Sequence, residues 1–187
     1  MSGSVAKLDL LLNSYHKFIA IPWRDDAAAG QRVIFTVYNE TDERILRARI
    51  GEFEIVTTQS GHKWFAFDFT DTFARWMSSQ KYAQRYFENP DHLAALLPRY
   101  LDYLDDQFTD FLAANPIDER TVVSLIGVGS LFSFVKIKDV VDRFAPKVPG
   151  RLVVMFPGSY ENNNYRLLDG YDGWNYLAVP ITADKDY

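Results

Sequence analysis

The sequence predicts a single α/β domain, with a mostly parallel central sheet of about five strands flanked by helices. Its length of 187 residues fits one domain. Short β-branched and apolar runs, of which residues 32–38 (RVIFTVY) are the first, alternate with longer amphipathic stretches. Strands separated by helices need crossover connections, which join parallel strands and place helices on both faces of the sheet. A P-loop-like fold without a Walker A motif is one arrangement compatible with this order.

The first half of the chain predicts two strands, with helices between and around them. An N-terminal helix that ends before Pro22 is indicated by apolar residues spaced three and four apart, namely Leu8, Leu11, Leu12, Tyr15, Phe18 and Ile19. We expect strands at residues 32–38 and 63–69, because both runs are short, apolar and bounded by turn residues. Helices are expected at residues 42–58 and 72–87.

The second half predicts three more strands. A helix begins at Asn89-Pro90 and stops at Asn115-Pro116, and Pro98 should kink it or split it in two. Strands are expected at residues 121–126 and at 151–156, the latter closed by Pro157-Gly158, with a short helix at 137–144 between them. Residues 160–173 form a polar connection, and residues 174–181 form a terminal strand. Pro180 suits an edge position in that strand.

Composition narrows the classes of function. The chain has 20 basic and 25 acidic residues and a net charge of −5, which argues against direct DNA binding. The densest positive run indicates a solvated helix face rather than a phosphate track, and it comprises Lys136, Lys138, Arg143, Lys147 and Arg151. Cysteine is absent, which excludes disulfides and thiolate metal sites and fits a reducing compartment. With neither a leader nor an apolar run of about 18 residues, we expect a cytoplasmic protein without membrane contact.

A glycine-rich turn follows the strand at residues 121–126. Gly127, Gly129 and Ser130 occupy the place of a phosphate-binding turn, and they are the candidates for an anion site. However, Phe132 stands where the dinucleotide fingerprint has its third glycine, and no Gly-Lys-Ser/Thr sequence opens a helix. A tight turn between strand and loop is the favoured interpretation, and we expect no cofactor.

Catalytic and metal-binding patterns are missing. His16, His62 and His92 are far apart and form no ligand pair, so they are interpreted as surface or helix-end residues. Ser130 and Ser159 follow glycines but lack the Gly-x-Ser-x-Gly pattern of a nucleophile elbow. The sequence therefore predicts no catalytic and no metal-binding residue.

The connection that begins at Ser159 carries two open interpretations. Its three asparagines suit turns, because asparagine bonds its own backbone and tolerates positive φ. The same region holds residue types that anchor protein interfaces. Loops at the carboxyl ends of parallel strands also form the sites of α/β proteins. The candidates for an interaction surface are Tyr160, Glu161, Asn164, Tyr165, Arg166, Trp174 and Tyr176.

Three segments in this order resemble the BrxB family, a former domain of unknown function from BREX bacteriophage-exclusion systems. They are residues 127–132 (GVGSLF), residues 156–160 (FPG-Y, with Ser159 between) and residues 165–169 (YRLLD). The resemblance is strongest over residues 121–181 and extends to residues 32–43. One departure is Ser133, where the family pattern leads us to expect proline before Phe134.

The resemblance implies a non-catalytic accessory protein of a bacterial defence complex. Such systems contain a DNA methyltransferase, a large AAA+ ATPase and the alkaline-phosphatase-like protein PglZ. The expected partner is a PglZ-type protein, followed by the AAA+ ATPase. The alternatives are a degenerate nucleotide- or anion-binding subunit and a DNA-contacting subunit of the same complex. The family supplies no catalytic residues to carry over to this chain.

Overall fold

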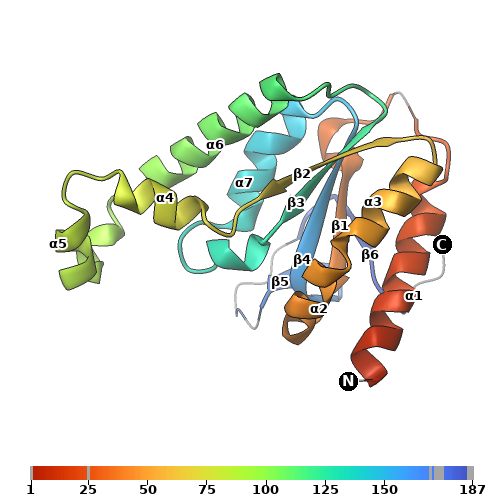
Figure 1. Ribbon diagram of the computed structural model, residues 1–187, viewed down its shortest axis with the longest axis horizontal. Helices are drawn as coiled ribbons and strands as arrows, with labels where there is room; N and C mark the ends of the chain where they lie inside the picture. The colour runs from red at the N-terminus through yellow and green to blue at the C-terminus, as the bar shows by residue number, and fades with distance from the viewer. Residues whose placement is uncertain (1, 25, 169, 171–174, 185–187) are drawn as a thin grey trace.

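The computed structural model describes residues 2–24, 26–168, 170 and 175–184, and within them one sheet organises the chain (Figure 1). The sheet has six strands, which run in the order β2-β3-β4-β1-β6, with β5 paired to β4. Their bounds are β1 Val33–Tyr38, β2 Lys63–Asp68, β3 Thr121–Ile126, β4 Arg151–Glu161, β5 Asn164–Leu167 and β6 Val179–Ile181. All pairs are parallel except β4 with β5. The predicted fold class is confirmed.

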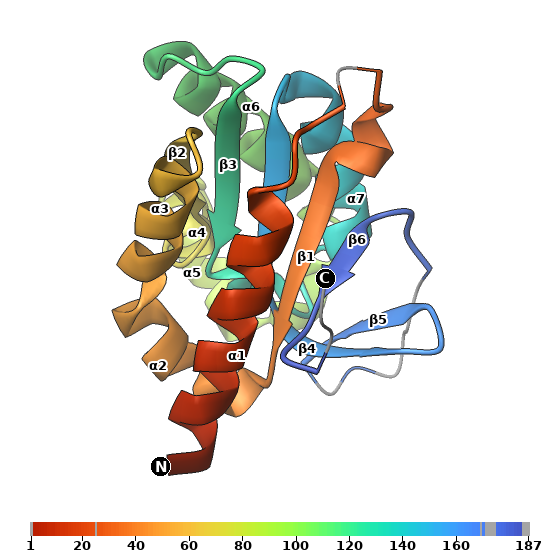
Figure 2. The same cartoon turned by 90° about the vertical axis from the view of Figure 1, so that its right-hand side faces the viewer.

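Helices cover both faces of the sheet, as crossover connections require (Figures 1 and 2). One face carries α1 Ser2–Ile19, α2 Glu43–Ala48 and α3 Ile50–Gln59. The other carries α4 Thr72–Ser78, α6 Leu97–Ala114 and α7 Ile137–Phe144, while α5 Ala83–Glu88 projects away from the sheet. Short 3-10 turns join these elements at Ala29–Arg32, Glu40–Asp42, Pro90–Leu93, Val128–Leu131 and Ala145–Lys147. Within the described ranges, none of these helices is both long and apolar enough to cross a membrane.

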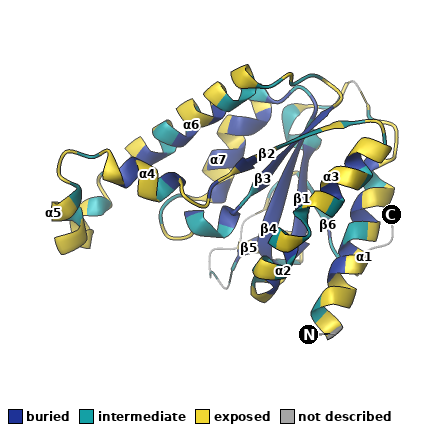
Figure 3. Ribbon diagram, in the orientation of Figure 1, coloured by how far each residue is buried: buried dark blue, intermediate teal, exposed yellow. Residues whose placement is uncertain are grey.

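The central strands are buried on both faces, which explains their uninterrupted apolar sequences (Figure 3). In β1, Val33 and Phe35 pack towards α6 and α7, whereas Ile34 packs towards α1 and α3. All six residues of β1 are buried. The alternation divides the core into two apolar layers that share one sheet.

Two predicted helices are each divided in the structure. The stretch at 42–58 is broken at Arg49, whose φ of −111° and ψ of 7° are not helical. The stretch at 72–87 is broken between Ser78 and Ala83. No proline or glycine stands at Arg49 or between Ser78 and Ala83, and Gly51 lies in the first turn of α3. Pro98, by contrast, lies in the first turn of α6, where its missing N–H costs no hydrogen bond.

The predicted end of the fourth strand at Phe156 is wrong. β4 runs through Pro157 and Gly158 to Glu161, and its last four residues pair with β5 in a hairpin. Glycine is needed at position 158, because a Cβ there would clash with the carbonyl oxygen of Arg166. The turn is made by Asn162 and Asn163, with φ of 50° and 63°. Part of the predicted polar connection is therefore a strand, since two residues with positive φ match the twist of a tight hairpin.

The predicted terminal strand is shorter in the structure than in the prediction. β6 comprises only Val179–Ile181, and Trp174, at the start of the predicted strand, lies outside the described residues. β6 pairs only with β1 and forms one edge of the sheet. The predicted edge position of Pro180 is confirmed.

Candidate functional site

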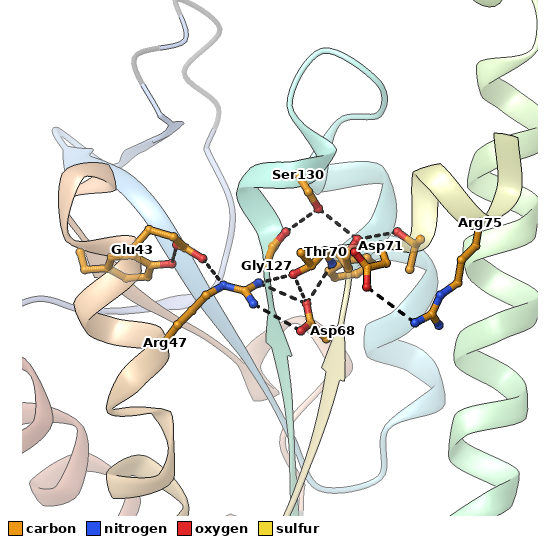
Figure 4. Close-up of polar contacts among 11 residues, drawn as sticks. Glu43, Arg47, Asp68, Thr70, Asp71, Arg75, Gly127 and Ser130 are labelled. Carbon is orange, nitrogen blue, oxygen red and sulfur yellow. Dashed lines mark hydrogen bonds and ion pairs between the residues drawn. The ribbon is translucent and has the colours of Figure 1, made fainter. Parts of the chain in front are cut away.

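A polar cluster gathers where β2 and β3 end, at the carboxyl edge of the sheet (Figure 4). Its centre is Arg47 on α2, which donates to Glu43 one turn earlier at 2.8 Å. The same guanidinium donates to both carboxylate oxygens of Asp68, at 3.2 and 3.4 Å, and to the Thr70 hydroxyl. This bidentate geometry is the strongest form of an arginine–carboxylate pair. The cluster therefore ties a helix on one face of the sheet to the end of an edge strand.

Gly127 makes room for the cluster. Its φ is 69°, in the left-handed region that glycine adopts at little cost. A Cβ at this position would lie 2.6 Å from Asp68 Oδ1 and 2.6 Å from Thr70 Oγ1, and closer still to the Arg47 guanidinium. The backbone conformation thus favours glycine at the end of β3, and a larger residue would also displace the side chains of the cluster.

The electrostatics of the cluster hold its groups in their ordinary charge states. Burial opposes ionisation of Asp68, but hydrogen bonds from Thr70 and Arg47 outweigh it and lower the pKa of this carboxyl. Tyr38 donates to Glu43, and burial together with the Glu43 charge raises the pKa of the phenol far above its usual range. Asp68 is therefore ionised and Tyr38 neutral at neutral pH, which suits a structural ion-pair network better than acid–base chemistry.

A small cavity of about 190 Å³ lies beside this cluster. Its polar lining comes from Tyr38, Glu43 and Arg47, and Gly127 forms part of its wall. The remaining lining is apolar and consists of Leu46, Ile50, Ile126 and Met155. The three polar side chains already hydrogen-bond to one another or to Asp68.

The anion-site candidates form an internally bonded turn. Ser130 Oγ donates to the Gly127 carbonyl oxygen at 2.7 Å and lies 3.1 Å from that of Phe69 (Figure 4). Gly129 lies beside β4, where a Cβ would be 3.5 Å from Pro157 Cγ. The Ser130 hydroxyl therefore closes the turn after β3, beside the end of β2.

The turn that follows departs from the BrxB-like pattern. Ser133 has a φ of 67°, which proline cannot adopt because its ring fixes φ near −65°. The proline expected from the resemblance would not fit this backbone.

Most of the basic run is paired with acids. Lys138 bonds Asp142 at 2.6 Å on α7 itself. Arg143 reaches Asp102 at 2.7 Å and Lys147 reaches Asp105 at 2.6 Å, both acids being on α6. Arg143 joins α7 to α6, and Lys147 joins the 3-10 turn after α7 to α6. These ion pairs agree with the interpretation as a solvated helix face. Arg151 lies elsewhere, with its guanidinium 4.7 Å from the ring centre of Trp23.

The exposed interaction candidates lie on the β4–β5 hairpin, which extends beyond the body of the sheet (Figure 2). Glu161, Asn164 and Arg166 are exposed. Tyr160 is half-buried, and its hydroxyl donates to Asn163 Oδ1 at 2.9 Å across the turn. The hairpin thus exposes charged and amide side chains on two paired strands, and the Tyr160–Asn163 hydrogen bond closes its turn.

The other candidates have different surroundings. Tyr165 is fully buried, packs against Phe35 and donates to the carbonyl oxygen of Ala178 at 3.1 Å. It is therefore a core residue that anchors the hairpin, and its interpretation as a surface contact is corrected. Tyr176 is half-buried, and burial and the Asp142 charge raise the pKa of its phenol. Trp174 lies outside the described residues.

Sequence reasoning missed the pairing of Arg47 with Asp68. The available indication was that Asp68 and Gly127 each close a strand, because the carboxyl ends of neighbouring parallel strands meet. Arg47 carried no such indication. Among the residues that the structure describes, no three histidine, aspartate or glutamate side chains are grouped so as to hold a metal ion.

Comparison of the chain with protein-family models, with curated proteins and with solved structures finds no match.

Proposed function

We propose that this chain is a non-catalytic adaptor of the BrxB type, acting in the cytoplasm as part of a BREX anti-phage defence complex. Its first partner is a PglZ-type protein, and the AAA+ ATPase of the system is the second. The proposal begins from three sequence segments that resemble those of the BrxB family and appear in the same order. They include Gly129, Pro157 and Leu168.

The observation that carries the proposal is that these three segments meet in space. A Cβ at Gly129 would touch Pro157 Cγ at 3.5 Å and Leu168 Cδ2 at 3.7 Å. The three segments thus build one corner of the molecule, and the hairpin extends from it. Residues separated by about forty positions in the chain serve one local structure, which supports treating them as one motif.

The hairpin is the surface that we assign to the partner. Arg166 and Glu161 are exposed charges on strands that a buried tyrosine holds in place. Because their backbone is already ordered, binding would fix few additional degrees of freedom, which favours affinity. Arginine is also among the residue types that dominate interface energetics.

The test is a pairwise pull-down of the full chain against each purified BREX component. We expect PglZ to be retained, and we expect Arg166→Glu to weaken binding about tenfold or more, since charge reversal at a contact costs at least about 1.4 kcal/mol. Arg44→Glu, an equally exposed charge reversal on α2, is the matched control and should bind normally.

The two parts of the proposal fail separately. If no component is retained at micromolar concentration, the adaptor function is wrong. If PglZ is retained equally by the parent chain, by Arg166→Glu and by Arg44→Glu, the function stands and the hairpin is not the contact.

A further inference from the structure

At the outer edge of β2, no strand among the described residues pairs with the backbone. The amides of Lys63 and Phe69 donate to the carbonyls of Arg120 and Ile126, both at 3.0 Å, so they point towards β3. Because the direction alternates along a strand, the N–H and C=O groups of Trp64, Ala66 and Asp68 point away from the sheet. Ala66 is exposed, and no helix crosses in front of β2 in Figure 1.

β2 has few of the usual protections of an edge strand. Proteins guard edges with short strands, prolines, bulges, charged side chains or a covering helix or loop. β2 is six residues long and pairs with β3 in unbroken register. Its two charged residues stand at its ends, and each is in an ion pair, Lys63 with Asp118 at 2.6 Å and Asp68 with Arg47 at 3.2 Å. The four residues between them carry no charge. The edge is therefore suited to the addition of another strand.

We propose that β2 pairs antiparallel with β2 of a second copy of this chain, so that the two sheets continue across a two-fold axis at Ala66. In this register Ala66 faces Ala66 of the second copy, and Trp64 faces Asp68. All three outward-pointing residues of β2 then exchange backbone hydrogen bonds with the same three residues of the second copy. This interface is independent of the hairpin assigned to the partner above.

The side chains of β2 complement themselves in this register. Ala66, the smallest residue of β2, lies on the axis. Phe65 of each copy lies opposite Phe67 of the other, which gives two aromatic cross-strand pairs. Lys63 falls opposite Phe69, and no like charges oppose each other. Centring the axis on Asp68 would place two carboxylates together, and centring it on Trp64 would leave half of the strand unpaired. An axis at Phe65 or Phe67 would pair only two of the three outward residues within β2, whereas the axis at Ala66 pairs all three. The register at Ala66 is therefore the one that we assign to a second copy.

The absence of cysteine from the chain permits a direct test. Ala66→Cys should form a disulfide-linked dimer under mild oxidation, because Cα atoms of a hydrogen-bonded antiparallel pair lie about 5.5 Å apart, within disulfide range. Lys63→Cys, on the same strand but away from the axis, is the matched control and should remain largely unlinked.

A second measurement uses the unlinked protein. Sedimentation of the full chain should give twice the mass of 21.6 kDa at high concentration. Ala66→Pro should be monomeric with unchanged circular dichroism, since it removes only an outward N–H. The proposal is overturned if the parent chain stays monomeric and Ala66→Cys forms no dimer. It is also overturned if Lys63→Cys links as readily as Ala66→Cys.

Discussion

The two edges of the sheet differ in length, composition and surroundings. β6 has three residues, and one of them, Pro180, has no N–H to donate. Just before β6, the carbonyl oxygen of Ala178 accepts a hydrogen bond from the hydroxyl of buried Tyr165. β2 has six residues without proline, and in the part of the chain that the structure describes no strand pairs with its outer edge. One edge is thus shortened and blocked, and the other is left open for pairing.

This difference determines which edge of the sheet can accept a further strand. A short edge strand with proline cannot recruit a further strand, whereas a long regular one can. An open edge is a liability unless something pairs with it. The contrast therefore supports a specific neighbour for β2 and none for β6.

The largest expected effect comes from removing the residue that fastens the hairpin beside β6. Tyr165→Ala deletes a fully buried ring that packs on Phe35 and Phe156, and we expect the free energy of unfolding to fall by about 3–5 kcal/mol. Urea unfolding followed by circular dichroism measures this change. Tyr165→Phe keeps the ring and loses only the bond to Ala178, so its cost should be about 1 kcal/mol.

Comparison of these two variants separates packing from hydrogen bonding. Equal losses for Tyr165→Ala and Tyr165→Phe would mean that the hydroxyl, rather than the ring, holds the hairpin. A loss below about 1 kcal/mol for Tyr165→Ala would contradict its place in the core.

A smaller effect is expected beside the open edge, at the polar cluster that ends β2. Gly127→Ala forces a left-handed backbone on alanine and crowds Arg47 and Asp68, and it should cost roughly 1–3 kcal/mol in the free energy of unfolding. Gly129→Ala, two residues on, meets only ordinary van der Waals contacts and should change stability by less than about 0.5 kcal/mol. Thermal unfolding of both variants checks the prediction, and similar losses would show that the close approach at Gly127 relaxes freely.

The sheet was largely predictable from sequence, because β-branched runs such as residues 121–126 have few alternatives to a buried strand. β5 was not, since a tetrapeptide with two polar residues resembles a loop until its partner is known. The local indication of a hairpin was the run of asparagines, a residue type that tolerates positive φ, and Asn162 and Asn163 adopt it in the structure. The helix break at Arg49 was not predicted, because arginine is an ordinary helix-forming residue.

The site was less predictable than the fold. The tight turn at Gly127 followed from its place after a strand. Its cause did not, because Arg47 and Asp68 are 21 positions apart and meet only through the packing of α2 against the sheet. Likewise, Tyr165 and Arg166 are adjacent in sequence but lie on opposite faces of β5, one buried and one exposed. Only the assignment of the strand distinguishes them.

The smallest expected effect concerns the other end of β2 and depends on pH. His62 immediately precedes β2 and stacks on Trp23, with ring centres 3.7 Å apart. Burial and the nearby Arg120 charge lower the pKa of its imidazole. The folded state therefore binds its proton less readily than the unfolded state, whose pKa is about 6.5.

The sign of the pH dependence follows from this lowered pKa. The contribution of His62 to stability is fully present above about pH 6.5 and is lost as pH falls from there through the lower pKa of the folded state. His62→Phe keeps the stack on Trp23 and removes the titration, so its free energy of unfolding should fall less than that of the parent chain between pH 7 and pH 5. The difference should be below about 1 kcal/mol, because the ring is partly exposed and its charge is screened. Parallel slopes from urea unfolding at several pH values would mean that the stack tolerates a charged imidazole, and that this end of the open edge strand is insensitive to pH.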